Sequence, residues 1–417
     1  MQENGIYRLG LILYKTGMKR IYSEIIEEHL HSNRQMIFIA GPRQVGKTTV
    51  ARLVQGERGC YVNWDNLADR KILLKGPDAM ATRCGLSLLR EESVLIVFDE
   101  IHKYAKWKSF LKGFFDIYGD QCKILVTGSA RLDVYKKGGD SLLGRYFLYR
   151  MHPQSVAEIF EPVLLETEIR KPGSIPQDKL DTLLQYSGFP EPYLANNRRF
   201  YNRWQRMRLD LLFREELRDL TRIQEVGQVQ VLAKILQYQA SQSVNYSNLA
   251  NEINVSVDTV CRWIATLESL YYCFSVRPWF RNIPKSLRKQ PKIFLWDWSG
   301  IKNDGARHEN FVASHLLKAV HWWTDIGLGE YHLYYLRDKE KREVDFLVTR
   351  DDIPWFLVEV KTSGKQSLNK NLFYFQKKTG AQHAFQVAFD LEFIEQDCFS
   401  VKKPVIVPAT TFLSQLV

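Results

Sequence analysis

The chain has 417 residues, of which 45% are hydrophobic and 25% are charged. These values are typical of a folded protein and exclude a disordered, collagen-like or disulfide-stapled polypeptide. Lys and Arg together number 58 against 47 Asp and Glu, which gives a formal net charge of +11. The positive balance favours a polyanionic partner such as nucleic acid without proving one. At roughly 150 residues per domain, the length predicts about three domains.

The six cysteines are scattered along the chain and contain no C-x-x-C pair. This spacing supports neither a zinc ribbon nor a thioredoxin-like centre, and we interpret the cysteines as reduced thiols of a cytoplasmic protein. No apolar run approaches the roughly 18 residues of a membrane span, so we expect no membrane partner. The N-terminus lacks the pattern of a signal peptide. An amphipathic helix pattern begins at Met18, which makes Met18 as well as Met1 a candidate native start.

Three apolar, strand-like runs occupy residues 36–40, 94–98 and 123–127, and segments of helix length separate them. This rhythm is typical of a parallel sheet covered by helices on both faces, so we predict an α/β domain. Residues 162–178 are rich in Pro, Gly and charge and indicate a boundary or exposed linker. Long helical patterns follow over 199–242. From Glu309, one helix alternates with strands again and predicts a final α/β unit.

A phosphate-binding motif follows the first strand. Residues 41–48 match G-x-x-x-x-G-K-[ST] and lead into a helical pattern, which is the context that a P-loop requires. Glycines permit the turn that aims backbone N–H groups at phosphates, Lys47 neutralises the β- and γ-phosphates, and Thr48 offers a hydroxyl to Mg²⁺. We therefore expect ATP and Mg²⁺ as cofactors, with contacts from Gly41, Pro42, Arg43, Gln44, Val45, Gly46, Lys47, Thr48 and Thr49.

Two further strands end in polar residues that suit hydrolysis. The run 94–98 is followed by Asp99, which we expect to hold Mg²⁺ through water, and by Glu100, which is placed to orient or deprotonate the attacking water. The run 123–127 ends in Thr127 and Ser129, candidates for sensing the γ-phosphate or positioning the water. Arg145 is a candidate arginine finger for a neighbouring subunit, which implies a homo-oligomer such as a hexamer-like ring. An ordinary surface arginine is the alternative.

Five segments together resemble the AAA-type ATPases of bacteria and archaea that carry a C-terminal domain of uncharacterised role. They are GPRQVGKTT (41–49), FDEIHKYAKWKSFLK (98–112), ILVTGSARL (124–132), SLLGR (141–145) and SGFPEPY (187–193). The resemblance covers nearly the whole chain. It implies an AAA+ core, a helical middle with a winged helix, and a C-terminal α/β domain similar to the PD-(D/E)xK, or restriction endonuclease-like, nuclease fold.

Residues 247–267 predict a helix, a short turn and a second helix capped by Ser256, a helix-turn-helix pattern. We expect Asp258, Thr259, Arg262 and Thr266 on the exposed side of the second helix. The basic segment 277–292 follows, with six basic residues, no acidic residue, and two aromatic side chains, Trp279 and Phe280. Basic groups pair with phosphates and aromatic rings stack on bases, whereas solvation or subunit packing is the alternative. The predicted DNA contacts are Arg262, Arg277, Arg281, Lys285, Arg288, Lys289 and Lys292.

A carboxylate and lysine set marks the C-terminal region. The strand-like runs around Asp345 and 355–361 are joined by a turn, so they predict an antiparallel hairpin in which Glu359 and Lys361 share one face. Glu309 could approach the same end. Carboxylates can hold Mg²⁺ while a lysine orients water or stabilises a pentacovalent phosphate. The set Glu309, Asp345, Glu359 and Lys361 resembles a PD-(D/E)xK site and is similar in order and spacing to archaeal Holliday junction resolvases. A plain charge ladder is the alternative.

These observations predict four domains: an ATPase core (18–165), a helical lid or linker region (166–240), a winged helix (241–292) and a nuclease-like domain (293–417). The leading hypothesis is a DNA-binding ATPase that remodels duplex or branched DNA, including Holliday-like junctions, or moves along it. The second hypothesis is an ATP-regulated, metal-dependent endonuclease. The third is a signalling or scaffold NTPase that binds proteins.

Overall fold

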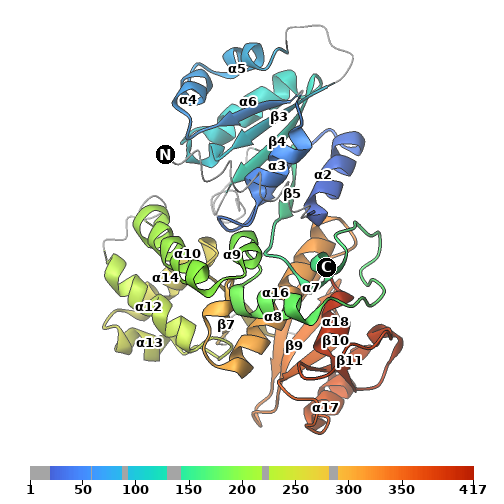
Figure 1. The fold of residues 1–417 in the computed structure, drawn as a ribbon. Coiled ribbons are helices and arrows are strands. Elements are labelled where there is room, and N and C mark those ends of the chain that lie inside the picture. The colour runs from blue at the N-terminus through green and yellow to red at the C-terminus, as the bar shows by residue number, and fades with distance from the viewer. Residues whose placement is uncertain (1–18, 58, 87–92, 129–141, 218–224, 281–289) are drawn as a thin grey trace. The chain divides into compact units, whose positions relative to one another are not determined.

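The computed structural model describes residues 19–57, 59–86, 93–128, 142–217, 225–280 and 290–417 (Figure 1). The chain forms two compact units. The first unit contains the described residues up to His152 together with 162–164, and the second contains 153–161 and 165–417. The chain therefore passes between the units three times, after His152, Glu161 and Leu164. Among the described residues, no helix is both long enough and apolar enough to cross a membrane.

The first unit is built on a five-stranded sheet in the order β2-β3-β4-β1-β5, and each described pairing in it is parallel. Its strands are fully or largely apolar, as expected for a sheet that is covered on both faces. The parallel α/β sheet predicted from the sequence is therefore present. The strands are β1 (Met36–Ala40), β2 (Cys60–Asn63), β3 (Val94–Asp99), β4 (Cys122–Gly128) and β5 (Tyr146–Arg150).

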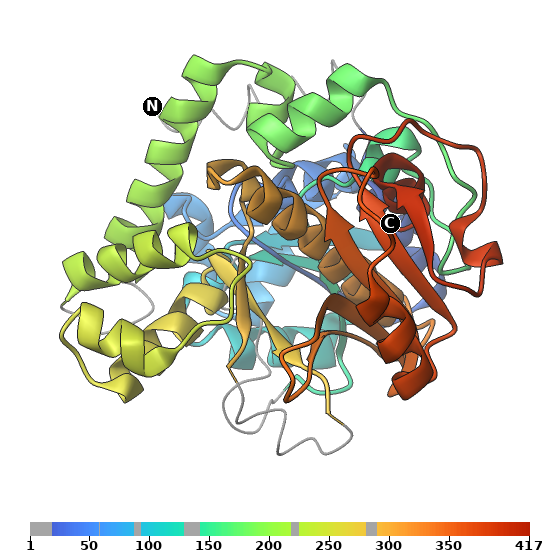
Figure 2. The same cartoon turned by 90° about the horizontal axis from the view of Figure 1, so that it is seen from below.

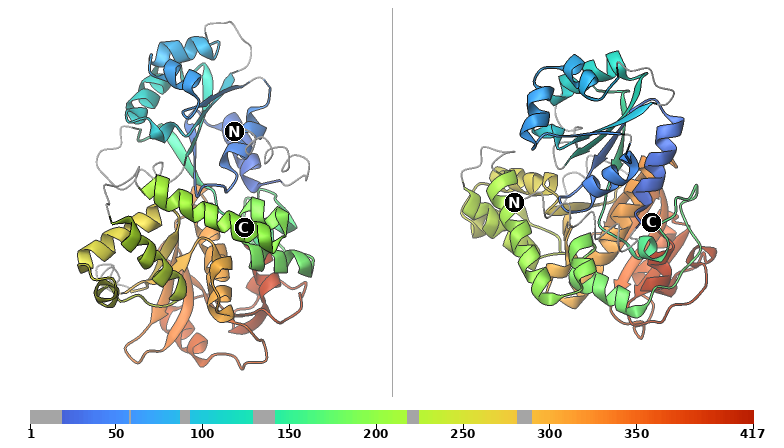
Figure 3. Two further views of the ribbon diagram at one scale, coloured as in Figure 1. Left: turned by 60° about the vertical axis from the view of Figure 1, so that its left-hand side comes forward. Right: turned by 45° about the horizontal axis from the view of Figure 1, so that its top comes forward.

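Helices cover both faces of this sheet. Figure 3 shows α2 and α3 on one side and α4, α5 and α6 on the other. The α6 side holds a buried cluster in which Phe38, Phe98 and Val126 of the strands meet Trp107 and Phe114 of α6. The helices are α2 (Ile21–Ser32), α3 (Lys47–Gln55), α4 (Leu67–Leu73), α5 (Pro77–Arg83) and α6 (Trp107–Tyr118), with a 3-10 turn η1 (Ile101–Lys103).

A disulfide joins Cys60 of β2 to Cys84, which follows α5. The expectation that all the cysteines are reduced thiols is therefore wrong for this pair. The four remaining cysteines are free. Sequence spacing did not reveal the pair because the two cysteines lie 24 residues apart, and only the packing of α5 beside β2 brings them together.

The second unit combines a helical region with a large sheet. Helices α10, α12, α13 and α14 lie on one side of the unit, and β9, β10, β11 and α17 lie on the other (Figures 1 and 2). The helices are α7 (Val156–Phe160), α8 (Gln177–Tyr186), α9 (Pro190–Ala195), α10 (Arg198–Leu211), η3 (Leu212–Glu216), α12 (Val226–Tyr238), α13 (Tyr246–Glu252), α14 (Val257–Ser269), η4 (Trp298–Gly300), α16 (Asp304–Asp325), α17 (Lys370–Thr379), η5 (Cys398–Ser400) and α18 (Ala409–Ser414).

The sheet of the second unit has seven strands in the order β12-β11-β10-β9-β8-β6-β7. They are β6 (Cys273–Pro278), β7 (Lys292–Leu295), β8 (Tyr331–Arg337), β9 (Glu343–Arg350), β10 (Ile353–Lys361), β11 (His383–Ala388) and β12 (Val405–Pro408). The expected antiparallel hairpin is formed by β9 and β10. Strand β6 pairs with β7 on one side and with β8 on the other. The boundary expected at residue 293 therefore falls inside β7, and the last three expected domains share one compact unit.

The segment 153–161 is anchored within the second unit by α16. Lys318 of α16 donates to Glu158 over 2.6 Å and to the Ser155 hydroxyl over 2.8 Å, and both charged side chains are almost completely buried. His315 accepts a hydrogen bond from the Val156 N–H at Nε2 over 3.1 Å, while its Nδ1 lies 2.8 Å from the Phe311 carbonyl oxygen. These two contacts require a neutral imidazole with its proton on Nδ1.

This arrangement predicts acid sensitivity of the second unit. Burial lowers the pKa of His315 to about 3 from its ordinary value of 6.5. The unfolded chain takes up this proton below pH 6.5 and the folded chain does not, so the stabilisation is complete above pH 6.5 and declines as the pH falls towards 3. The slope from this single group is about 1.4 kcal/mol per pH unit.

His315→Gln keeps a donor and an acceptor but cannot titrate, so its free energy of unfolding should fall less steeply between pH 6.5 and 4.5. Urea denaturation at several pH values measures the slope, and similar stabilities at pH 8 would verify that the variant folds. Parallel slopes for wild type and variant would contradict the assignment.

Candidate functional sites

The phosphate-binding loop connects β1 to α3, and its two glycines are required for different reasons. A Cβ on Gly41 would collide with the carbonyl oxygen of Met151, so only glycine permits this close approach. Gly46 has a φ of 105°, in the left-handed region, and it directly precedes α3. The Lys47 ammonium is buried and donates to the carbonyl oxygens of Gly41 and Pro42 over 2.8 and 2.7 Å. The motif therefore forms a curled loop with its lysine held on the inner side.

Arg20 supports this loop from outside the motif. Its guanidinium donates to the carbonyl oxygens of Val45 and His152 over 2.7 and 2.6 Å, and its side chain is buried. The sequence analysis missed this residue because it precedes α2 and lies 25 residues from the carbonyl that it binds. No local pattern identifies such a contact.

Asp99 ends β3 and is enclosed by hydroxyl groups. Its carboxylate accepts hydrogen bonds from Thr48 over 2.9 Å, from Tyr61 of β2 and from Thr127 of β4. Burial raises the pKa of Asp99, the neighbouring charge of Glu100 raises it further, and the three hydroxyl donors lower it. The Thr48 hydroxyl and the Asp99 carboxylate are thus brought together as predicted. Tyr61 is a third partner that the sequence did not reveal.

Thr127 lies near the end of β4, beside Asp99. Its side chain is completely buried, and its hydroxyl donates to Asp99. The parallel register places Thr127 directly opposite Asp99, which explains the contact. The contact suits a positioning role for the carboxylate, while the expected role in sensing the γ-phosphate or positioning the water stays a prediction. Ser129, the second candidate at this strand end, lies outside the described residues.

Glu100 occupies a left-handed conformation, with a φ of 56°, directly after β3. Its backbone N–H donates to the Thr127 carbonyl oxygen over 3.1 Å. Its carboxylate lies 3.4 Å from the Lys103 ammonium and 3.7 Å from Nε2 of His102. A non-glycine residue in this conformation is uncommon and concentrates at functional sites.

Arg145, the candidate arginine finger, forms a two-pronged ion pair inside its own unit. Its Nε and Nη2 atoms donate to the two carboxylate oxygens of Asp116 on α6 over 2.7 and 3.1 Å. This contact agrees with the alternative of an ordinary surface arginine. The role in a neighbouring subunit stays a prediction.

The two helices predicted from residues 247–267 are α13 and α14. Ser256 caps α14 by accepting from the Thr259 N–H over 3.1 Å. The apolar side chains of this segment are buried, namely Leu249, Ile253, Val260, Ile264 and Leu267. Asp258 and Arg262 are exposed, as expected. Thr266 is a correction, since it is buried and its hydroxyl bonds the Arg262 carbonyl oxygen over 2.9 Å.

The predicted DNA contacts are only partly described. Arg262 is exposed on α14 and Arg277 is half-buried on β6. Lys292 is a correction, because its side chain is only 4% exposed and is surrounded by carboxylates. The remaining four, Arg281, Lys285, Arg288 and Lys289, lie outside the described residues.

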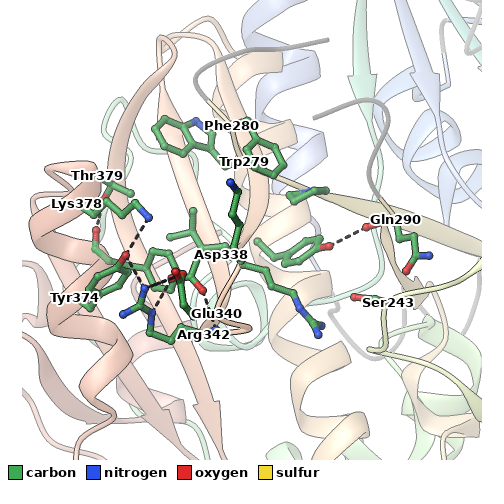
Figure 4. Close-up of a pocket in the computed structure, with 16 residues that line it drawn as sticks. Ser243, Trp279, Phe280, Gln290, Asp338, Glu340, Arg342, Tyr374, Lys378 and Thr379 are labelled. Carbon is green, nitrogen blue, oxygen red and sulfur yellow. Dashed lines mark hydrogen bonds and ion pairs between the residues drawn. The ribbon is translucent and has the colours of Figure 1, made fainter. Parts of the chain in front are cut away.

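A pocket of about 1320 Å³ lies beside the end of β6 (Figure 4). Trp279 and Phe280 line one side, and Tyr374 and Lys378 of α17 line another. The Trp279 N–H donates to the Tyr335 carbonyl oxygen over 2.9 Å, which fixes the backbone of this residue to β8. Lys339 also lines the pocket and is exposed. The pocket thus combines flat aromatic surfaces with cationic groups and two carboxylates.

The C-terminal carboxylates also converge. The Lys292 ammonium of β7 lies 3.0 Å from Glu309 of α16, and 2.7 and 3.4 Å from Glu343 and Asp345 of β9. Glu309 and Asp345 thus approach one another, whereas Glu343 is a carboxylate that the sequence did not single out. Lys292 was expected to contact DNA.

Glu359 and Lys361 of β10 complete this carboxylate cluster. The Lys361 ammonium and the Asn369 amide donate to the same oxygen of Glu359 over 2.8 and 2.7 Å. The second oxygen of Asp345 accepts from the Val360 N–H over 2.8 Å. No group of three or more His, Cys, Asp or Glu side chains is arranged to hold a metal ion in the described part of the chain. Two of the expected Mg²⁺ ligands, Glu309 and Asp345, contact the Lys292 ammonium instead, and the third, Glu359, is paired with Lys361.

Comparison with known proteins divides the chain into three matched regions. Residues 33–160 match the model of an AAA domain, 177–303 match a domain of unknown function (DUF8612), and 304–405 match a second one (DUF4143). Uncharacterized proteins of Mycobacterium bovis and Mycobacterium tuberculosis are each 25% identical over 354 residues, which are 81% of this chain and 72% of theirs.

Among solved structures, DnaA of Aquifex aeolicus bound to AMPPCP has 16% identity and a TM-score of 0.32, with 60% of this chain and 88% of that chain covered. The Orc1 protein of Aeropyrum pernix in complex with DNA has 16% identity and a TM-score of 0.33, with 70% and 91% covered. Both scores are too low to establish a common fold over the matched length. The informative finding is the match of the family model: residues 33–160, which contain the P-loop motif and the parallel sheet, are similar to an AAA domain.

Proposed function

We propose that the protein is a Mg²⁺-dependent ATPase that binds DNA and uses ATP hydrolysis to remodel duplex or branched DNA or to move along it. The ATPase part rests on one contact: the Thr48 hydroxyl donates to the Asp99 carboxylate over 2.9 Å, beside the lysine of the phosphate-binding loop. This donor set suits Mg²⁺, which prefers oxygen ligands and binds through few protein groups. When bound, Mg²⁺ would neutralise charge on the phosphates.

The protein groups divide the remaining work. Lys47 would bind the β- and γ-phosphates, and the N-terminus of α3 would direct its free N–H groups at them. Tyr61 and Thr127 would keep the Asp99 carboxylate in one orientation through their hydroxyl groups. Glu100 would orient the attacking water and accept its proton.

Two variants separate binding from hydrolysis. Lys47→Ala should abolish ATP binding or productive phosphate geometry, because the loop loses its positive charge. Glu100→Gln should still bind ATP but hydrolyse it at least about 100-fold more slowly, because only the group acting on water is lost. Binding of a fluorescent ATP analogue and release of phosphate measure the two steps. Glu57→Gln is the matched control, because it removes the charge of an exposed carboxylate after α3. Equal loss of ATP binding in both test variants would refute these roles.

A third variant tests the positioning role of Thr127. Thr127→Val keeps the shape of the side chain but removes the hydroxyl, and this donor normally lowers the pKa of Asp99. The acidic limb of the pH profile of ATP hydrolysis should therefore move to higher pH, and more Mg²⁺ should be needed for half-maximal activity. Thr127→Ser should restore both values. An unshifted profile in a folded Thr127→Val protein would show that the hydroxyl does not act on the carboxylate.

The DNA part of the proposal is supported by the second unit. Helix α14 exposes Arg262 after a capped turn, which is how a recognition helix offers side chains to a groove. The pocket beside β6 offers Trp279 and Phe280 as stacking surfaces and Lys339 as a cation. Aromatic rings with nearby basic groups are the usual means of holding unpaired bases. The net charge of +11 favours the same class of partner.

Salt dependence tests this part. Arg262→Ala and Lys339→Ala should each weaken binding to duplex DNA and lower the slope of log K against log salt by roughly 0.9, the effect of one lost phosphate contact. Lys403→Ala removes the same charge near β12, at the opposite edge of the sheet from β7, and should leave the slope unchanged. Fluorescence anisotropy over a salt series measures all three. Unchanged slopes in both test variants would favour a scaffold that binds proteins.

Assembly into a homo-oligomeric ring stays a further prediction of this proposal. That prediction was based on Arg145, which forms an ion pair with Asp116 within its own unit. Cytoplasmic location stays an expectation from the sequence.

A further inference from the structure

Lys292 is a buried cation with three anionic partners from two different elements. Glu309 comes from α16, whereas Glu343 and Asp345 come from β9, and their oxygens lie 3.0, 2.7 and 3.4 Å from Nζ. An ammonium group with 4% side-chain exposure would be strongly destabilising without such partners. The Tyr335 ring also lies 5.6 Å from Nζ. The cluster is thus built around the lysine.

Lys292 contacts two of the three carboxyl groups that a divalent metal would need as ligands. Mg²⁺ requires oxygen ligands at about 2.0–2.1 Å in nearly octahedral geometry. Here the oxygens of Glu309 and Asp345 are directed at an ammonium group, and a dication placed between them would meet a like charge at contact distance. Three carboxyl groups within 3.4 Å of Nζ favour the charged form of the lysine, so the ammonium group is the counter-charge of the cluster.

We propose that Lys292 is the permanent cation of the C-terminal carboxylate cluster, so that the wild-type domain binds no divalent metal there and does not cut DNA by a metal-dependent route. Removal of the ammonium group converts the cluster into a divalent-cation site. The inference does not rest on the proposed ATPase function, because it concerns residues of the second unit alone.

A second observation indicates which group would complete that site. One oxygen of Glu359 holds both Lys361 and Asn369, but the other is buried and has no hydrogen-bond partner among the described residues. The side chain is only 7% exposed. An uncompensated carboxylate oxygen of this kind is costly, and a cation ligated by Asp345 and Glu359 would satisfy it.

The decisive measurement is Mn²⁺ binding, followed by electron paramagnetic resonance on the full chain without nucleotide. All proteins carry Asp99→Asn, which removes the carboxylate expected to hold a metal ion beside the phosphate-binding loop. The first comparison uses the native cluster: Asp345→Asn should not change Mn²⁺ binding if Lys292 already occupies the site. A loss of bound Mn²⁺ in this variant would overturn the proposal.

The second comparison opens the site. Lys292→Met, close in length but uncharged, should gain one Mn²⁺ site at least about tenfold tighter than any in the parent, and additional Asp345→Asn should remove it. Lys292→Arg keeps the cation and should behave as the parent. A folded Lys292→Met protein that gains no Mn²⁺ site would overturn the inference. If Lys292→Met is unfolded without metal, refolding on addition of Mn²⁺ supports the inference. If Mn²⁺ does not refold it, the effect of Asp345→Asn on Mn²⁺ binding in the parent decides the question.

DNA cleavage is an independent test of whether a metal binds the carboxylate cluster. Supercoiled, linear and four-way-junction DNA incubated with the wild-type chain and Mn²⁺ should stay intact. Cutting that disappears with Asp345→Asn would show that a metal reaches the carboxylates of the wild-type protein, and would overturn the proposal.

Discussion

A single buried ammonium group decides how the second unit is organised. Lys292 lies on β7, the edge strand of the seven-stranded sheet, and its partners come from α16 and β9. A buried charge must be compensated. If β7 moved away from α16 and β9, three neighbouring carboxylates would lose their counter-charge and repel one another. This requirement explains why the strands that follow the α13–α14 pair are not a separate module. They continue the C-terminal sheet through the pairing of β6 with β8.

The first unit depends on a constraint of a different kind, the parallel register of its sheet. Parallel strands end at the same edge, so Asp99 of β3 and Thr127 of β4 become direct neighbours. The loop after β1 reaches the same edge and delivers Thr48 at the start of α3. Three segments that are far apart in the sequence thereby form one polar site. The hydroxyl groups offset part of the cost of burying the Asp99 carboxylate, which the pKa shift reflects.

The sequence was informative wherever a local pattern carries the signal. Apolar runs located β1, β3 and β4 to within a residue or two, the glycines and Lys47 identified the loop, and Ser256 marked the start of α14. It was uninformative where a side chain meets a distant segment. Arg20 and Tyr61 bind atoms 25 and 38 residues away, and nothing near them in the sequence announces this. The number of basic residues in segment 277–292 also gave a wrong expectation for Lys292. A count of charges does not reveal which side chain of the segment is buried.

The chain enters the second unit directly after Met151 and His152, two residues that contact the strand and the arginine beside the phosphate-binding loop. The Met151 N–H donates to the Ala40 carbonyl oxygen over 2.7 Å, and the His152 carbonyl oxygen is held by Arg20. Four residues after His152, the Val156 N–H donates to His315, and Glu158 forms an ion pair with Lys318. Both ends of this short connection are buried and hydrogen-bonded, each within its own unit. Helix α16 therefore has two roles in the second unit: it holds the entering chain through His315 and Lys318, and it presents Glu309 to the carboxylate cluster.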